Sequence, residues 1–335
     1  METRAPGRGF LSVIGAINWD VTIFEDRFPR VGEEVQARLV EEYPGGKGAN
    51  VAVAAARVLG AGRVSLVGAL GDDDVSERQL AGLRAEGVLT GGVSTLTGSR
   101  SGMAYIVVDE RGRKTIHTQF GANGELTPAH LAKENVARLV SRSSMIVVMD
   151  PPTSVALAAV SRAKERWCRV VYSPGVRAQE GLRRIGPVIR RADILVVDSS
   201  ELKNLAGLEA EDPSLEALSN AFPRVTVVVT LGAKGCVVSR GTVKTVLEGV
   251  DLAALGLRAV NSTGSGDAFL GVLASYLTWG KTVEEAASWA NLAGALKAAR
   301  YETRGSPGAK ELEDSMGALG ELRRRPRGSP GSRAS

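Results

Sequence analysis

The segment 261–267 reads Asn-Ser-Thr-Gly-Ser-Gly-Asp and could place an anion beside a carboxylate. It runs directly into the apolar stretch 268–274, so a glycine-rich turn is expected to lead into a helix. The free N–H groups of a first helical turn favour phosphate, and Gly264 and Gly266 allow the backbone to approach a ligand closely. A carboxylate there would repel phosphate, unless it takes the proton from a hydroxyl that attacks phosphorus. We therefore predict that Asp267 is a catalytic base; the alternative is an acid that only stabilises its own helix.

Apolar strand candidates alternate with segments of helical length along most of the chain. The expected strands are 11–17, 64–67, 145–149, 170–173, 194–197 and 225–230, with helices over 48–60 and 75–86. Two further β-rich runs, 103–109 and 115–118, flank a turn signal and predict a hairpin. The alternation predicts an α/β fold with a mostly parallel sheet and helices on both faces.

Polar side chains follow several of these strands. Asn18, Asp20, Asp150 and Asp198 come after apolar strand candidates, as the 261–267 turn does. In open sheets of this type, ligands bind beyond the carboxyl ends of the strands. One cleft could therefore collect all of these groups.

Composition excludes several classes of protein. The 335 residues are 44% hydrophobic and 24% charged, which is typical of a globular protein. No stretch of about 18 uncharged apolar residues and no secretory leader is present, so we expect no membrane span and a cytoplasmic location. Two cysteines and two histidines are too few for a disulfide framework or a zinc site. The P-loop and dinucleotide-binding patterns are absent, which leaves a nicotinamide enzyme as a weak alternative.

The net charge of +5 is concentrated at the carboxyl end, where residues 321–335 hold five arginines and one glutamate. Together with Gly, Ser and Pro, these residues predict a basic, disordered tail over 316–335. We expect no nucleic-acid partner, because the rest of the chain is nearly neutral. An RNA-binding protein that uses the tail is the rival hypothesis.

The segment 43–57, Tyr-Pro-Gly-Gly-Lys-Gly-Ala-Asn-Val-Ala-Val-Ala-Ala-Ala-Arg, is the second glycine-rich motif. With the 261–267 turn it resembles the two signatures of the ribokinase/phosphofructokinase-B family of carbohydrate kinases. The similarity runs from residue 11 to about 307 and includes motifs at 18–20, 120–123 and 230–235 in family order. It implies a ribokinase-like, Rossmann-like fold with one domain over 1–315. It also implies a discontinuous β lid from about 21–44 and 100–119, through which a homodimer could form.

The resemblance also implies roles for individual residues. Asp267 matches the catalytic base, next to the anion pocket of Gly264, Ser265 and Gly266. The positions that match sugar-binding residues are Asn18, Asp20, Gly45, Gly46, Lys47, Asn50 and Asp150. Those that match nucleotide-binding residues are Asp198, Thr230, Gly232, Gly235 and Asn291, and Glu201 matches a residue that holds Mg²⁺ through water. Read alone, Asn50 could be a helix cap, Lys47 a surface lysine, Asp198 and Glu201 a capping box, and Asn291 a solvated polar residue.

The implied activity is transfer of a phosphoryl group from ATP, or ADP, to a hydroxyl of ribose or a related furanose, with Mg²⁺ as cofactor. A nucleoside is the second choice of acceptor, since Trp19 beside Asn18 and Asp20 could stack on a nucleobase; a sugar phosphate is the third. A catalytically silent sugar-binding homologue is an alternative of another class. Asn261-Ser262 replaces the family's usual Asp-Thr, whose aspartate helps bind an activating monovalent cation, so a potassium requirement stays open.

Overall fold

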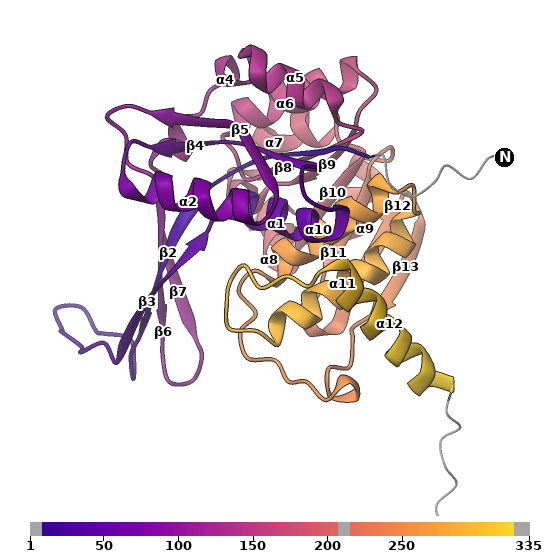
Figure 1. Ribbon diagram of the computed structural model, residues 1–335. Coiled ribbons are helices and arrows are strands. Elements are labelled where there is room, and N and C mark those ends of the chain that lie inside the picture. Colours follow the sequence, from indigo (N-terminus) through magenta and orange to yellow (C-terminus); the bar gives the residue numbers. More distant parts are fainter. Residues whose placement is uncertain (1–8, 207–214, 325–335) are drawn as a thin grey trace, which may run out of the picture.

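The computed structural model describes residues 9–206 and 215–324, and its centre is a nine-stranded sheet (Figure 1). Its strands are β1 (Leu11–Gly15), β4 (Val64–Gly71), β5 (Val88–Leu96), β8 (Met145–Met149), β9 (Arg169–Ser173), β10 (Ile194–Asp198), β11 (Thr226–Thr230), β12 (Gly235–Arg240) and β13 (Val243–Glu248). Their order is β13-β12-β11-β10-β9-β8-β1-β4-β5. All neighbours pair in parallel except β11 with β12 and β12 with β13. The carboxyl ends of the central strands therefore meet at one edge.

Helices cover both faces of this sheet, because successive strand side chains point to opposite sides. Val13 belongs to one hydrophobic core and its neighbour Ile14 to the other. The first core is closed by α1 (Lys47–Leu59), α2 (Asp74–Ala85), α10 (Ser265–Thr278), α11 (Val283–Ala298) and α12 (Ala309–Arg324). The second is closed by α3 (Ala122–Glu125), α4 (Pro128–Ala132), α5 (Glu134–Arg142), α6 (Thr153–Glu165), α7 (Gly181–Ile189), α8 (Ser199–Ala206) and α9 (Leu215–Ala221). Short 3₁₀ turns η1 (Gly175–Glu180), η2 (Gly232–Lys234) and η3 (Ala253–Leu255) complete the elements.

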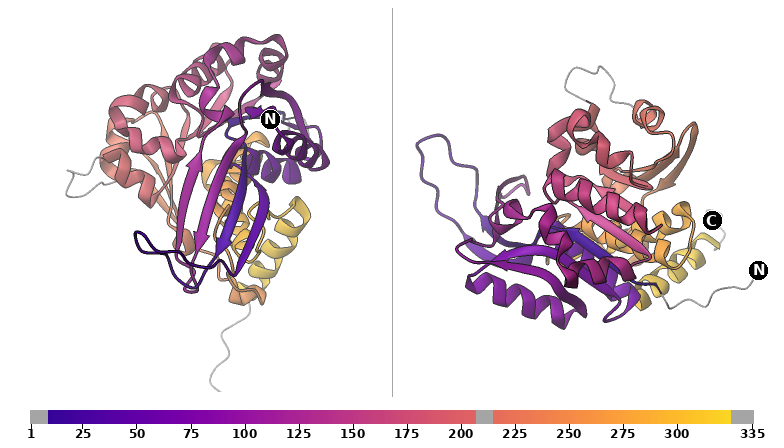
Figure 2. Two further views of the ribbon diagram at one scale, coloured as in Figure 1. Left: turned by 90° about the vertical axis from the view of Figure 1, so that its left-hand side faces the viewer. Right: turned by 90° about the horizontal axis from the view of Figure 1, so that it is seen from above.

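A second, four-stranded sheet projects from the body, as Figure 2 shows. Its strands are β2 (Asn18–Phe24), β3 (Leu39–Gly45), β6 (Gly102–Val108) and β7 (Lys114–Gln119), in the order β3-β2-β6-β7. β2 and β6 are parallel, while the two outer pairs are antiparallel. This sheet confirms the expected lid, including the predicted hairpin.

The carboxyl end departs from expectation. Helix α12 continues past residue 315, where a disordered tail was expected to begin. Met316 and Leu319 of this helix pack against the first core, so an apolar stripe lies within the basic sequence. The rest of the predicted tail, residues 325–335, lies outside the described residues. Within the described chain, no helix is long and apolar enough to cross a membrane.

Candidate active site

One cavity of about 530 Å³ lies between the strand ends, the start of α10 and the lid. Its volume is in the usual range for small-molecule sites. Twelve of the residues predicted from the sequence line it: Asn18, Asp20, Gly46, Lys47, Asn50, Asp150, Asp198, Glu201, Thr230, Gly264, Gly266 and Asp267. Ala104, Ile106 and Ile116 of the lid form part of its wall. The fold thus gathers segments from across the chain around one cavity.

Asp267 lies in the first turn of α10, at the positive end of the helix. The turn before it depends on Gly264, whose φ of 84° is left-handed and where a Cβ would clash with the Thr303 carbonyl. The Asp267 side chain is nearly buried and accepts a hydrogen bond from Asn50 Nδ2 at 2.8 Å. Burial raises the pKa of Asp267, and the opposing effects of Asn50 and Lys47 are smaller. A carboxylate with a raised pKa can accept a proton more readily near neutral pH.

Asn50 does not cap helix α1, whose start at Gly46 has no side-chain cap. Its amide nitrogen faces Asp267, and its oxygen accepts a hydrogen bond from Arg304 Nε at 3.2 Å. Arg304 also donates to the Gly45 carbonyl at 2.9 Å and to Gln79 Oε1 at 3.2 Å. The buried guanidinium therefore fixes the orientation of the amide that holds Asp267.

Arg304 and Gln79 were missed by sequence reasoning. Gln79 Nε2 also donates to the carbonyl of Asn18, so it ties α2 to the start of the lid. A third missed residue, Asn123, donates to Asn18 Oδ1 at 2.9 Å and to the Ile17 carbonyl at 2.8 Å. Its only signal in the sequence was its place in the 120–123 motif.

Strand β2 presents Asn18 and Asp20 to the cavity, and Trp19 to the opposite face. Burial raises the pKa of Asp20 to about 7, helped by the nearby charge of Asp267 and opposed by Arg304. The Trp19 indole instead donates to Glu42 at 2.9 Å and stacks under the Arg78 guanidinium, 4.0 Å from the ring centroid. The expectation that Trp19 could stack on a bound nucleobase is therefore wrong.

Asp150 follows β8 in a left-handed conformation, with φ of 60°. Its Oδ1 and the facing Arg177 Nε lie 3.9 Å apart, and neither has a hydrogen-bond partner in the described structure. Lys47 Nζ lies 4.0 Å from Asp150 Oδ2. Buried polar atoms are rarely left unpaired, so this arrangement suits a ligand that supplies hydroxyl groups. Burial raises the pKa of Asp150 to about 6, although Lys47 and Arg177 lower it.

The raised pKa of Asp150 predicts a pH-dependent cost to folding. The folded chain binds this proton more tightly than the unfolded chain does, so the contribution of Asp150 to wild-type stability falls as pH rises from about 4 through about 6. Asp150→Asn, which tolerates positive φ, removes this effect. We expect the variant to gain about 1–2 kcal/mol of unfolding free energy relative to wild type between pH 5 and pH 8, measured by urea unfolding. The exposed Asp314→Asn is the control, and an equal effect of Asp150→Asn at both pH values would contradict the prediction.

At the other end of the cavity, Asp198 and Glu201 form the capping arrangement that was the alternative to a metal role. Asp198 Oδ1 accepts from the backbone N–H groups of Ser200 and Glu201 at 2.8 and 2.7 Å, and Glu201 Oε2 accepts from the Asp198 N–H at 3.1 Å. Both side chains nevertheless face the cavity. Burial and the charge of Asp198 raise the pKa of Glu201 to about 7, while Lys47 lowers it.

Five predicted site residues do not line the cavity: Gly45, Ser265, Gly232, Gly235 and Asn291. Gly45 lies directly behind the Asp20 carboxylate, which a Cβ would meet. The Ser265 hydroxyl is buried and has no partner among the described residues. Gly235 holds a turn with φ of 96°, and Asn291 Nδ2 lies 3.4 Å from the Leu247 carbonyl at the end of β13. Gly232, Gly235 and Asn291 therefore lie outside the cavity wall, whereas Thr230, which begins the same predicted nucleotide-binding loop, lines the cavity.

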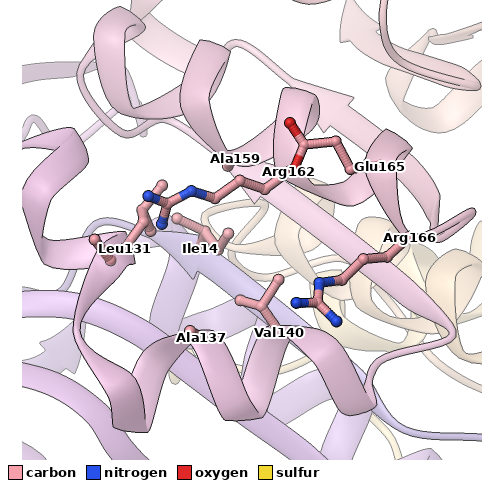
Figure 3. Close-up of a pocket in the computed structure, with 9 residues that line it drawn as sticks. Ile14, Leu131, Ala137, Val140, Ala159, Arg162, Glu165 and Arg166 are labelled. Atoms are coloured by element: carbon pink, nitrogen blue, oxygen red, sulfur yellow. The ribbon is translucent and has the colours of Figure 1, made fainter.

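A smaller cavity of about 260 Å³ lies elsewhere, between α4, α5 and α6. Its walls are mainly apolar, with Ile14, Leu131 and Val140 inside, and it is flanked by Arg162 of α6 and by Arg166, the residue that follows α6 (Figure 3). It shares no lining residue with the larger cavity. Its one carboxylate is that of Glu165, whereas Asp20, Asn50, Asp150 and Asp267 line the larger cavity.

Comparison with known proteins agrees with this geometry. The model of the pfkB family of carbohydrate kinases matches residues 9–309. A ribokinase of Haemophilus influenzae is 29% identical, over 89% of this chain and 95% of its own. An ATP-dependent ribose-1-phosphate kinase of Halopiger xanaduensis is 33% identical, over 88% of this chain and 94% of its own. The crystal structure of a ribokinase from Thermotoga maritima superposes with a TM-score of 0.80 at 26% identity, over 92% of this chain and 99% of that one.

The family match covers both glycine-rich motifs, the lid and the residues around the cavity. Its members transfer a phosphoryl group to an alcohol, which is the chemistry inferred from the 261–267 turn. This chain belongs to the pfkB family of carbohydrate kinases.

Proposed function

We propose that this kinase transfers the γ-phosphoryl group of ATP to a hydroxyl of ribose or a related furanose, with Asp267 as general base. The proposal rests on the position of the Asp267 carboxylate. It is held by Asn50 at the start of α10, in the same cavity as Asn18, Asp20 and Asp150. A sugar hydroxyl bound to those polar groups would lie between the base and the amides of the α10 turn.

The reaction follows from this placement. As the sugar oxygen bonds to the γ-phosphorus, its proton passes to Asp267, and the bond from the γ-phosphorus to the β,γ-bridging oxygen breaks to release ADP. The N–H groups of residues 264, 266 and 267 stabilise the charge on the transferring group, while that of Ser265 donates to the Ser262 carbonyl at 3.1 Å. The lid residues Ala104, Ile106 and Ile116 form an apolar wall that limits access of water, which would otherwise compete as acceptor.

Asp198 and Glu201 are the residues that would hold Mg²⁺ beside the nucleotide. Each carboxylate uses one oxygen in the helix-capping bonds, and its other oxygen would be available to a water bound to the metal. A cation would also relieve the repulsion that helps raise the pKa of Glu201. Among the described residues, no three His, Cys, Asp or Glu side chains could hold a metal without other ligands. This fits Mg²⁺, which keeps several waters and is bound largely by substrate phosphates, whose charge it neutralises.

Ribose is preferred because the acceptor end of the cavity is rich in hydrogen-bonding groups. Asp20, Asp150 and Asn18 can each bind hydroxyls. The one residue that favoured a nucleoside, Trp19, faces away from the cavity. The names of the relatives, a ribokinase and a ribose-1-phosphate kinase, support a ribosyl acceptor with or without a phosphate.

A panel of acceptors tests the proposal. Ribose, fructose, a nucleoside and ribose-1-phosphate are each supplied with ATP and then with ADP as donor. We expect kcat/KM to be highest for ribose with ATP, by at least about tenfold. Preferred turnover of the nucleoside or of the sugar phosphate would overturn the choice of acceptor, and a preference for ADP would overturn the choice of donor.

A further inference from the structure

Lys297, near the end of helix α11, is fully buried although it carries an ammonium group. Its Nζ donates to two backbone carbonyls, that of Asn261 at 2.9 Å and that of Arg300 at 3.3 Å. None of the ion pairs within 4.0 Å found among the described residues includes Lys297. A buried charge is costly unless it is well coordinated, so this contact requires an explanation beyond packing.

We propose that Lys297 acts as a resident monovalent cation that positions the phosphoryl-binding turn 261–267. It is a positioning residue, since it touches the backbone that forms the turn and not the reacting atoms. The proposal rests on the kinase function of that turn. It does not depend on which sugar is the acceptor.

The ammonium lies at the junction of two loops. Residues 260 and 261 both donate their N–H groups to the Ala298 carbonyl, at 2.7 and 3.0 Å. Asn261 Nδ2 donates to the Tyr301 carbonyl at 2.7 Å, and Asn261 Oδ1 accepts from the Thr263 N–H at 2.9 Å. At Gly264, the Thr303 carbonyl lies close enough to exclude a side chain. The position of the α10 start is therefore set by contact with residues 298–303, and Lys297 joins the two loops with a charge.

A local role would be simpler, because lysines in the last turn of a helix often bind free carbonyls. The bond to Arg300 is of this kind. The bond to Asn261 is not, since it reaches 36 residues away to the residue that begins the phosphoryl-binding turn. Two carbonyl oxygens from separate loops converge on the ammonium as they would on a bare cation.

The charge state of Lys297 suits this role. Burial, assisted by the charges of Lys114 and Arg300, lowers the pKa of Lys297 to about 8, while the charges of Glu302 and Asp267 oppose this shift. The group therefore remains largely protonated at neutral pH.

Two experiments test the proposal. Wild-type enzyme is assayed with its best acceptor in buffers that contain only Na⁺, only K⁺ or only a bulky organic cation; we expect equal kcat within about twofold. In Lys297→Met we expect kcat to fall about 10- to 100-fold, because the turn shifts, and ADP to bind more weakly by calorimetry. Added ammonium or K⁺ should restore part of the kcat of the variant. The exposed Lys281→Met is the matched control and should behave as wild type.

Several results would overturn it. Wild-type kcat that rises several-fold with K⁺ over Na⁺ would show that a separate cation is needed. Wild-type values of kcat and of ADP affinity in Lys297→Met would show that the lysine only caps its helix. A folded Lys297→Met whose lowered kcat is restored by neither ammonium nor K⁺ would show the same. If Lys297→Met does not fold, the wild-type cation series still decides. ADP binding is measured by calorimetry without an acceptor. An error in the choice of sugar can therefore be distinguished from an error in the role of Lys297.

Discussion

Asp267→Asn is expected to lower kcat by about 10³- to 10⁴-fold while sugar affinity changes little, because the variant keeps the shape of the side chain and loses the base. An asparagine oxygen can still accept the hydrogen bond that Asn50 donates at 2.8 Å in the wild type. Removal of a buried carboxylate with a raised pKa also leaves the fold at least as stable at neutral pH. The measurements are steady-state kcat and the Kd of the acceptor by calorimetry.

A matched variant separates this role from simple stabilisation of the helix. Glu284 is an exposed acid in the first turn of α11, as Asp267 is in the first turn of α10. If Asp267 only complemented the helix dipole, both Asp267→Asn and Glu284→Gln would cost about 0.3–1 kcal/mol of stability and leave kcat unchanged. Unchanged kcat in Asp267→Asn would rule out the base. Undetectable turnover of every acceptor by the wild type, together with tight sugar binding, would instead favour a silent sugar-binding homologue.

The fold was largely predictable because its signals are local. A buried parallel strand is a short apolar run, and a polar residue directly after it lies at the ligand-binding edge, as Asp150 does after β8. The Gly264 turn could be predicted in the same way, from a glycine before an apolar helix. Trp19 was misjudged although its face could have been read from the period-two alternation of β2. The start of the tail was misjudged because its charge obscured the apolar stripe of α12.

Other parts of the site could not be predicted from the sequence, since they depend on contacts between distant segments. Arg304 donates hydrogen bonds to Asn50, which is 254 residues away in the sequence, and to Gln79, which is 225 residues away. Gln79 is one polar residue on an amphipathic helix, and Arg304 and Lys297 are basic residues in a region with several others. Nothing in their local pattern distinguishes a buried cation from a solvated one. Only the packing of the 297–304 segment against α1 and the 261–267 turn reveals their roles.

Arg304→Met is the second variant with a large expected effect, because the guanidinium donates to three groups of the buried hydrogen-bond network. Its loss leaves Asn50 Oδ1, the Gly45 carbonyl and Gln79 Oε1 without their donor. It also removes a positive charge that lowers the pKa values of Asp20 and Asp267. We expect kcat/KM to fall about 10²-fold and the unfolding free energy to fall by about 3 kcal/mol, measured by steady-state kinetics and urea unfolding.

The pH profile distinguishes a positioning role from general damage to the fold. In the wild type, kcat/KM should fall as pH drops through about 7, where Asp20 gains a proton. Without the nearby charge the pKa values of Asp20 and Asp267 rise, so the acid limb of Arg304→Met should shift to higher pH. Arg304→Lys keeps the positive charge but loses the planar guanidinium with its several N–H donors. Its acid limb should therefore lie at the wild-type pH, while its kcat/KM should recover only in part relative to Arg304→Met. An unshifted acid limb in a folded Arg304→Met would show that the guanidinium does not control the charge of these carboxylates, and that its contribution is packing alone.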